Sequence, residues 1–383
     1  MPLLLIASSV HATFIVAPHT AGRDADLSGN TVASPEDAGS AQYVNPAGVV
    51  GAPSSQTMLA LAAMNFTARY TDDSRGYRST SSETPLLLNF WYGLGEWNGW
   101  HMGVGTYGSV GTAFDFASDP SNGQTSPYVG KLMVLNLGFN MGRAITDDLR
   151  FGFQITPRYG KQSLETPTPA GDVDFDIDGF GIVGSLGLVY DVSDTLSLGL
   201  TYQSTGLVDM DGDGTVGGQR ENVEHDLHTP QNVTAGAAYQ WSDKTRVMAQ
   251  LKWTDYNDFE RGDVEFENTA ALNQPFIADT KNRIRWGLGL EHEVVPDSWL
   301  RVSFSYESWM IEDSSLRPYL FDNRDLMLMA GYEIRYETLS LGFIGGYADL
   351  SERSVTASQN PVTPGNYGGN TDIMAGVRIT WHR

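Results

Sequence analysis

A two-residue alternation of apolar and polar side chains recurs along most of this chain and constrains its fold more than any other feature. In a typical stretch, Leu196, Leu198, Leu200 and Tyr202 alternate with polar or small residues. Successive side chains of a β-strand point to opposite faces, so a period of two indicates strands with one apolar and one polar face. Such stretches, each about 10 residues long, are typical of strands that cross a membrane in a β-barrel.

The connections between these stretches sort by length. We count fourteen strand candidates, which begin near residues 58, 85, 98, 128, 149, 173, 195, 222, 244, 280, 298, 322, 337 and 369. Every second connection is tight: 95–97, 146–148, 193–194, 242–243, 295–297 and 335–338. The others are long and polar: 71–84, 111–127, 162–172, 209–221, 257–279, 311–321 and 351–368. An outer-membrane barrel shows this arrangement, with short turns facing the periplasm, and an even strand count places both termini there.

Other protein classes fit less well. A soluble β-sandwich or propeller also alternates, but it has no reason to sort connection lengths around the whole chain. No apolar run approaches the ~18 residues of a membrane-spanning helix, and the absence of cysteine excludes a disulfide scaffold. A net charge of −22 leaves no basic surface for nucleic acid. The sequence therefore predicts an all-β, 14-stranded antiparallel barrel in a bacterial outer membrane, without a nucleic-acid partner.

The chain before the first strand has a different character. Residues 1–12 contain an apolar run and end in a small-x-small triplet, Val10-His11-Ala12, which indicates a signal peptide. Residues 13–57 do not alternate and are rich in small residues and proline. We expect them to fold into the lumen as a hatch, since fourteen strands enclose a space too wide for lining side chains to fill. A disordered periplasmic tail is the alternative, and residues 58–383 form the barrel.

One strand changes its apolar face partway along. The apolar side chains are Val173, Phe175 and Ile177 at first, and then Phe180 and Ile182. A one-residue slip moves side chains to the other face of a strand, so the pattern predicts a β-bulge or kink near Gly179.

A family resemblance appears just before the first strand. The motif Asn45-Pro46-Ala47, after a stretch rich in Ala, Asp and Gly, resembles the hatch motif of FadL-type outer-membrane transporters. Three further stretches resemble strands of that family: 178–204, 229–256 and 298–309. The resemblance implies passive uptake of long-chain fatty acids or other hydrophobic small molecules, which bind in the lumen and leave through a gap in the wall into the membrane lipid. It also leads us to expect a monomer.

Two cations on inward faces are candidates to bind a ligand carboxylate. Arg158 follows polar residues on the inner face of its strand, and Lys252 shares its face with Gln250 and Thr254. A pocket for such a ligand needs an apolar lining and a few polar groups for the head. The alternative for each cation is an ion pair that lines an acidic lumen.

Three glycines weaken the third strand: Gly103, Gly105 and Gly108. The resemblance places a kink of the barrel wall in this strand, so these glycines and the Asn45-Pro46-Ala47 motif are candidates for gating. The alternative for the glycines is simple packing against the hatch.

The remaining motifs point to no metal, cofactor or catalytic site. Asp209-x-Asp211-x-Asp213 begins like a calcium loop, but its twelfth position is Arg220 in place of the glutamate that binds calcium. A solvated acidic hairpin is the simpler interpretation. Two other functions stay open: a diffusion porin for polar solutes, with an open lumen, and a barrel-anchored surface enzyme or adhesin, with a catalytic cluster or a large ordered surface in its loops.

Overall fold

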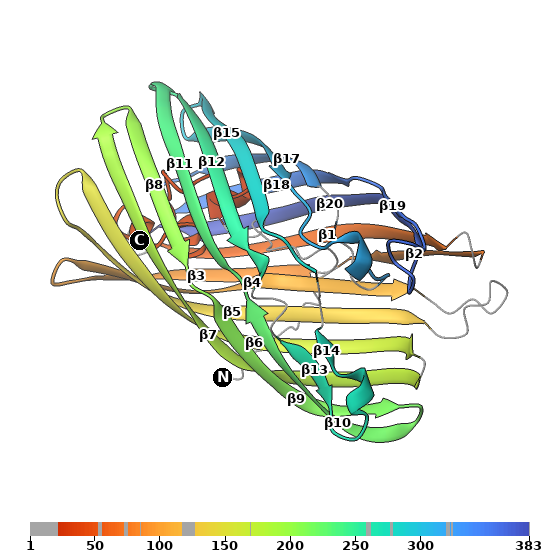
Figure 1. Cartoon of the computed structure of the whole chain (residues 1–383). Helices are drawn as coiled ribbons and strands as arrows, with labels where there is room; N and C mark the ends of the chain where they lie inside the picture. The colour runs from red at the N-terminus through yellow and green to blue at the C-terminus, as the bar shows by residue number, and fades with distance from the viewer. Residues whose placement is uncertain are drawn as a thin grey trace.

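The computed structural model describes residues 22–52, 56–72, 76–84, 86–116, 127–168, 170–257, 262–275, 279–318, 322 and 325–382. Fourteen of the strands in these ranges form a closed antiparallel barrel (Figure 1). In order around the wall they are β1 (Thr57–Asp72), β3 (Leu86–Trp97), β4 (Trp100–Phe116), β5 (Tyr128–Ala144), β6 (Leu149–Thr168), β7 (Gly171–Ser193), β8 (Leu196–Gln203), β11 (Gln231–Ser242), β12 (Thr245–Asp255), β15 (Arg283–Val295), β16 (Ser298–Glu307), β17 (Asp325–Arg335), β18 (Leu339–Leu350) and β20 (Gly365–Trp381). Pairing of β20 with β1 closes the ring, and the predicted 14-stranded barrel is confirmed.

Shorter strands extend the sheet where the long connections lie. They are β2 (Tyr77–Glu83), β9 (Gly206–Val216), β10 (Gln219–Thr229), β13 (Asp263–Phe266), β14 (Gln274–Pro275) and β19 (Arg353–Val355). The prediction of a loop over 209–221 and a barrel strand from near 222 was wrong, because β9 and β10 form a hairpin there. The barrel strand β11 begins after Pro230, which lacks the N–H that would continue a ladder.

The two ends of the barrel differ as predicted. Tight turns gather at the left end in Figure 1, and the long connections with β2 and β19 lie at the right end. Between β3 and β4 the turn residues Asn98 and Gly99 have φ of 50° and 77°. Positive φ at both central positions is the geometry of a two-residue hairpin turn that matches the twist of the strands.

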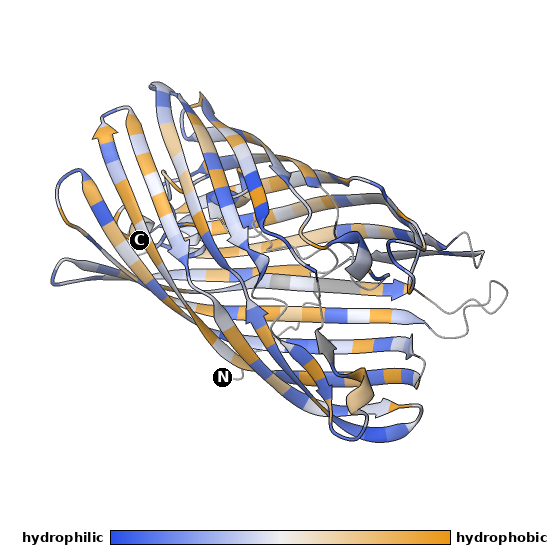
Figure 2. Cartoon of the chain, viewed as in Figure 1, coloured by the Kyte–Doolittle hydropathy of each residue, from blue (hydrophilic) through white to orange (hydrophobic). Residues whose placement is uncertain are grey.

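The outer wall is an apolar belt. On β20, Ile373 and Val377 are 56% and 45% exposed, whereas Met374 and Arg378, the residues that directly follow them, are buried. Hydrophobic residues, coloured orange, alternate with hydrophilic or intermediate ones along the barrel strands (Figure 2). An exposed apolar face is costly in water and stabilising against lipid, so this belt fits the membrane. No helix among the described residues is long and apolar enough to span a membrane.

Strand β7 is regular through Gly179, which pairs with Gly160 of β6 and Met210 of β9. The predicted bulge was therefore wrong. Phe175 is buried inside the barrel, whereas Phe180 is 73% exposed on the outside. The apolar side chains change face because the lumen is itself apolar at the long-loop end.

A large cluster of inward apolar side chains fills that end of the lumen. We call it the lumenal apolar cluster; its largest members include Phe66, Tyr70, Phe114, Phe116, Phe175, Met210, Tyr256, Met310, Met327 and Tyr367. Several of its rings are in contact, and Phe66 and Phe114 meet edge to face with centroids 5.8 Å apart. The packing continues from strands β1 and β4 around to β17 and β20.

Residues 22–52, the lumenal segment, lie inside the barrel. They form α1 (Gly22–Asp26), α2 (Ala38–Tyr43) and the 3-10 turn η1 (Pro46–Val50), and almost all of their side chains are buried. Helix α2 begins after Asp37, whose side chain accepts a hydrogen bond from Ser40 N at 2.8 Å. The predicted signal peptide, residues 1–12, lies outside the described residues, as do residues 13–21 of the predicted hatch.

Candidate functional site

The Asn45-Pro46-Ala47 motif fixes the lumenal segment to the wall. Asn45 Oδ1 accepts a hydrogen bond from Ala47 N at 3.1 Å and so caps η1. Its Nδ2 donates to Val32 O within the segment and to Leu188 O of β7, at 2.7 and 3.0 Å. Both the oxygen and the nitrogen of this buried side-chain amide are therefore hydrogen-bonded. Asn45 holds the backbone of the segment in place where no helix or strand does so.

Inward glycines let the segment approach the wall. A Cβ at Gly187 of β7 would collide with Asn45 Oδ1, and one at Gly152 of β6 would collide with the backbone of Pro46. Close backbone approach is one of the main uses of glycine in a strand. The Asn45-Pro46-Ala47 motif thus packs against glycine positions on two neighbouring strands, β6 and β7.

Buried ion pairs hold helix α1 at the short-turn end. Arg23 Nε lies 2.6 Å from Glu291 Oε2, and Arg301 of β16 contacts both Glu291 and Asp26 at 2.6 and 3.0 Å. Arg378 of β20 joins Asp26 at 3.0 Å. This network could not be predicted from the sequence, because it depends on where α1 lies inside the closed barrel.

A cavity of about 80 Å³ lies in the lumen between the segment and the wall. Both cations singled out in the sequence, Arg158 of β6 and Lys252 of β12, line it. Much of the remaining lining is polar and uncharged: Thr201, Thr229, Asn232, Gln250 and Thr254. Tyr43 and Pro46 of the lumenal segment complete the wall on their side.

Arg158 is buried, and its hydrogen-bond partner is uncharged. It is 4% exposed, and its Nη1 donates a hydrogen bond to Thr229 Oγ1 at 2.6 Å. Its Nε has no hydrogen-bond partner among the described residues, and no carboxylate there forms an ion pair with it. The ion pair that we set against ligand binding is therefore not formed by the described part of the chain. A buried guanidinium without an anion is costly, so this position favours an anionic ligand.

Lys252 lies in a more crowded charge environment. It is opposite Arg285 of β15 in the strand register, and Glu307 of β16 lines the same cavity. Within the described ranges no carboxylate forms an ion pair with its ammonium group. Lys252 and Arg285 together make this side of the cavity attractive to anions.

The three glycines of β4 have two different environments. A Cβ at Gly103 would lie 2.8 Å from Gln42 Nε2, and one at Gly105 would collide with the same side chain, so both pack against the lumenal segment. Gly108 stands elsewhere, at a shift of the β4–β5 register between Gly108 and Val110. That shift is a β-bulge in the third strand of the barrel.

The wall is also interrupted beside this bulge. For the residues that the structure describes, pairing of β3 with β4 runs from Trp97↔Trp100 to Phe90↔Thr106 and no farther. The pairing of β4 with β5, by contrast, runs from His101↔Gly142 to Phe116↔Tyr128. Tyr107 then packs edge to face on Tyr43 of the lumenal segment, with centroids 5.3 Å apart.

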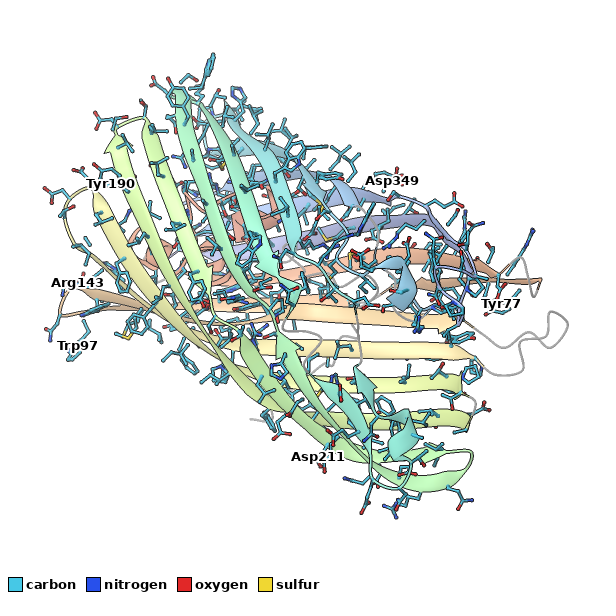
Figure 3. All side chains as sticks on the ribbon, in the orientation of Figure 1. Tyr77, Trp97, Arg143, Tyr190, Asp211 and Asp349 are labelled. Carbon is cyan, nitrogen blue, oxygen red and sulfur yellow. The ribbon has the colours of Figure 1, made fainter. Side chains whose placement is uncertain are left out.

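The acidic hairpin lies on the outer surface. Asp211 of β9 is exposed there (Figure 3), and Asp213 forms an exposed pair with Arg220 at 2.8 Å. Among the described residues no three potential ligands converge to hold a metal ion. The solvated hairpin is the interpretation that the geometry favours.

Comparison with known proteins identifies the family of this chain. The model of the family described as "Outer membrane protein transport protein (OMPP1/FadL/TodX)" matches residues 3–372. No curated protein matches the sequence. A crystal structure of a FadL homologue from Pseudomonas aeruginosa is 14% identical, with a TM-score of 0.79 over 98% of this chain and 100% of that one. The toluene transporter TodX of Pseudomonas putida is 17% identical, with a TM-score of 0.74 over 98% and 100%. At these identities the structures share the fold.

Proposed function

The chain belongs to the OMPP1/FadL/TodX family of outer membrane transport proteins, and on this premise we propose that it takes up hydrophobic small molecules, long-chain fatty acids among them. Uptake is passive and uses the lumenal cavity as a binding pocket. The observation that carries the proposal is Arg158, a buried cation with an uncharged partner, facing a cavity that Val44 and Pro46 also line. The family is one of transport proteins, and we assign no catalytic role.

The apolar tail and the anionic head of a fatty acid have different sites in this account. The lumenal apolar cluster receives the tail, since each CH₂ removed from water contributes about 0.8 kcal/mol. Arg158 and Lys252 receive the carboxylate. Charge-assisted hydrogen bonds to a buried guanidinium are about twice as strong as neutral ones.

The exit that we propose is sideways, through the wall beside β4. The register shift at Gly108 and the end of the β3–β4 ladder at Thr106 both lie on this path. Membrane lipid is the natural acceptor, because an alkyl chain gains nothing by entering the aqueous periplasm. The lumenal segment acts as a hatch that blocks the direct route, and we expect the protein to work as a monomer.

A diffusion porin for polar solutes is the second candidate, favoured by the polar residues that line the cavity. It requires an open bore, whereas the lumenal segment occupies the lumen of the barrel. Ion conductance across a planar bilayer separates the two. A conductance near that of the bare bilayer supports hydrophobic uptake, and large open-channel currents support the porin.

Binding tests the ligand directly. We expect palmitate to bind the full chain in lipid nanodiscs, with an affinity that falls about tenfold in Arg158→Gln, the loss of one charge-assisted contact. Lys161→Gln is the matched control, since Lys161 lies on the same strand but pairs with Asp176 on the exposed surface. Equal affinity in all three proteins would overturn the assignment of Arg158.

A further inference from the structure

Four titratable side chains form one cross-strand row beside the cavity. Lys252 of β12 is opposite Arg285 of β15, Arg285 is opposite Glu307 of β16, and Glu307 is opposite Asp325 of β17. Directly opposite residues of an antiparallel pair have Cβ atoms about 4.5–5.5 Å apart. The row therefore reads cation, cation, carboxylate, carboxylate across four neighbouring strands.

This order is unfavourable for the empty protein. Like charges that stand directly opposite one another destabilise a sheet, and the row contains two such pairs. An alternating order would have matched each cation with a carboxylate. Charge arrangements that destabilise the fold are expected mainly at functional sites, so this row is a candidate binding site.

The cationic half has no anion of its own. Arg285 is 7% exposed and donates hydrogen bonds to Ser28 O and Ser305 Oγ, both uncharged. For Lys252 and Arg285 alike, the described residues supply no ion pair. A phosphate or carboxylate placed between them would satisfy both.

The acidic half shares one cation with a further carboxylate. Glu307 lies 3.4 Å from Arg283, but Arg283 also holds the buried Asp322 at 3.1 Å. Asp325 is 8% exposed, and its Oδ1 has no hydrogen-bond partner in the described part of the chain. Asp372 of β20 is also buried, and its Oδ1 likewise has no hydrogen-bond partner among the described residues. Asp325 and Asp372 can therefore accept a positive group that the described residues do not supply.

The acidic half suits an organic cation better than a metal ion. No three metal ligands converge anywhere in the described ranges, so a metal ion has no coordination shell here. Asp372 is opposite Phe66 of β1, whose ring packs on Phe114. Carboxylates beside aromatic rings suit an alkylated ammonium group, which is attracted by charge and by the ring faces.

We propose that this row binds zwitterionic amphiphiles, with an anionic group at Lys252 and Arg285 and an ammonium group at Glu307 and Asp325. Neighbouring strands are about 4.8 Å apart, so the two halves of the row meet within the span of one compact head group. The inference rests on the proposed uptake of amphiphiles and narrows their class. A simple fatty acid satisfies the cationic half and leaves Asp325 without a partner.

Three amphiphiles with the same tail test the row: decylphosphocholine, decyl phosphate and decyltrimethylammonium. Each is titrated calorimetrically, below its critical micelle concentration, into the full chain in phosphatidylglycerol nanodiscs, whose lipid carries no competing ammonium group. We expect decylphosphocholine to bind about tenfold more tightly than either single-charge amphiphile. Equal or tighter binding of decyl phosphate overturns the inference.

Substitutions test which half of the row binds which charge of the ligand. Asp325→Asn should weaken decylphosphocholine about tenfold and tighten decyl phosphate, because it removes a nearby negative charge. Lys252→Gln should weaken both phosphate-bearing amphiphiles. Asp349→Asn, which removes an exposed carboxylate of β18 on the outer face (Figure 3), is the control. Unchanged binding in Asp325→Asn contradicts the row.

The two proposals fail separately. If palmitate binds but the ranking of the three head groups is absent, only the zwitterion inference falls. If neither palmitate nor any decyl amphiphile binds, the uptake proposal falls with it. The wild-type ranking alone decides the inference if a variant does not fold.

Discussion

Arg158 of β6 donates its Nη1 hydrogen bond to Thr229 Oγ1 of β10 at 2.6 Å, so a buried cation is held by a hydroxyl instead of a carboxylate. The contact links the barrel wall to the base of the outer β9–β10 hairpin, where Thr229 is the last residue of β10. It orients the guanidinium without neutralising it. The charge therefore stays available to a ligand in the cavity.

Thr229→Val tests this contact. It removes the acceptor and leaves a buried N–H without a partner, which costs about 1–3 kcal/mol in the free protein. A bound carboxylate restores the lost hydrogen bond, so we expect palmitate to raise the Tm of the variant more than that of the wild type. A smaller shift in the variant would show that Thr229 is itself part of the head-group site.

Gly187→Ala tests the contact between the lumenal segment and strand β7. The added Cβ collides with Asn45 Oδ1, and overpacking of this kind costs about 1–3 kcal/mol. We expect a displaced segment and a measurable rise in ion conductance across a planar bilayer. Gly345→Ala is the control, since the nearest atom to its Cβ is 3.9 Å away. Equal conductance in both variants would mean that the segment does not block the bore.

Arg301→Gln tests the buried ion pairs around α1. Arg301 contacts Asp26, Glu291 and Glu333, and removal of one partner from a buried pair costs about 3–5 kcal/mol. We expect a clear fall in thermal stability. In Arg335→Gln, which breaks a half-exposed pair with Glu333, the loss should stay below about 1 kcal/mol. Similar losses in both variants would contradict the anchoring role.

Deletion of Ser109 tests the proposed exit. Ser109 is the extra residue at the β4–β5 register shift, so its removal lets the two strands pair without a bulge. Uptake of labelled palmitate into liposomes should fall strongly, while palmitate binding persists. Uptake at the wild-type rate would place the exit elsewhere.

The β9–β10 hairpin should open as pH falls. Burial lowers the pKa of His225 to about 3, so the folded hairpin keeps this imidazole neutral. The open hairpin binds a proton below about pH 6.5, and stability present at pH 7 is lost toward pH 5, by about 2 kcal/mol. Hydrogen exchange of the β10 amides measures this loss. It should disappear in His225→Gln, and its persistence there would assign the effect to other groups.

Local periodicity was enough to predict the barrel and the direction of its side chains. Arg158 and Lys252 line one cavity because each occupies an inward position of its strand, which a period of two identifies. Alternation did not separate β10 from β11, because a hairpin outside the membrane alternates just as a barrel strand does.

Contacts that depend on closure of the barrel could not be predicted. The apolar lumen near Phe175 looked like a slipped strand, since a sequence cannot show that both sides of a wall are apolar. The pairing of Arg23 with Glu291 joins residues that are 268 positions apart in the chain. The row from Lys252 to Asp325 becomes visible only when the register of four strands is known.

A structure of the protein bound to palmitate tests the central claim most directly. The account predicts a carboxylate within hydrogen-bonding distance of Arg158 and an alkyl chain that runs into the lumenal apolar cluster. Palmitate bound only on the outer belt, with a hydrated and continuous bore past residues 22–52, would contradict it.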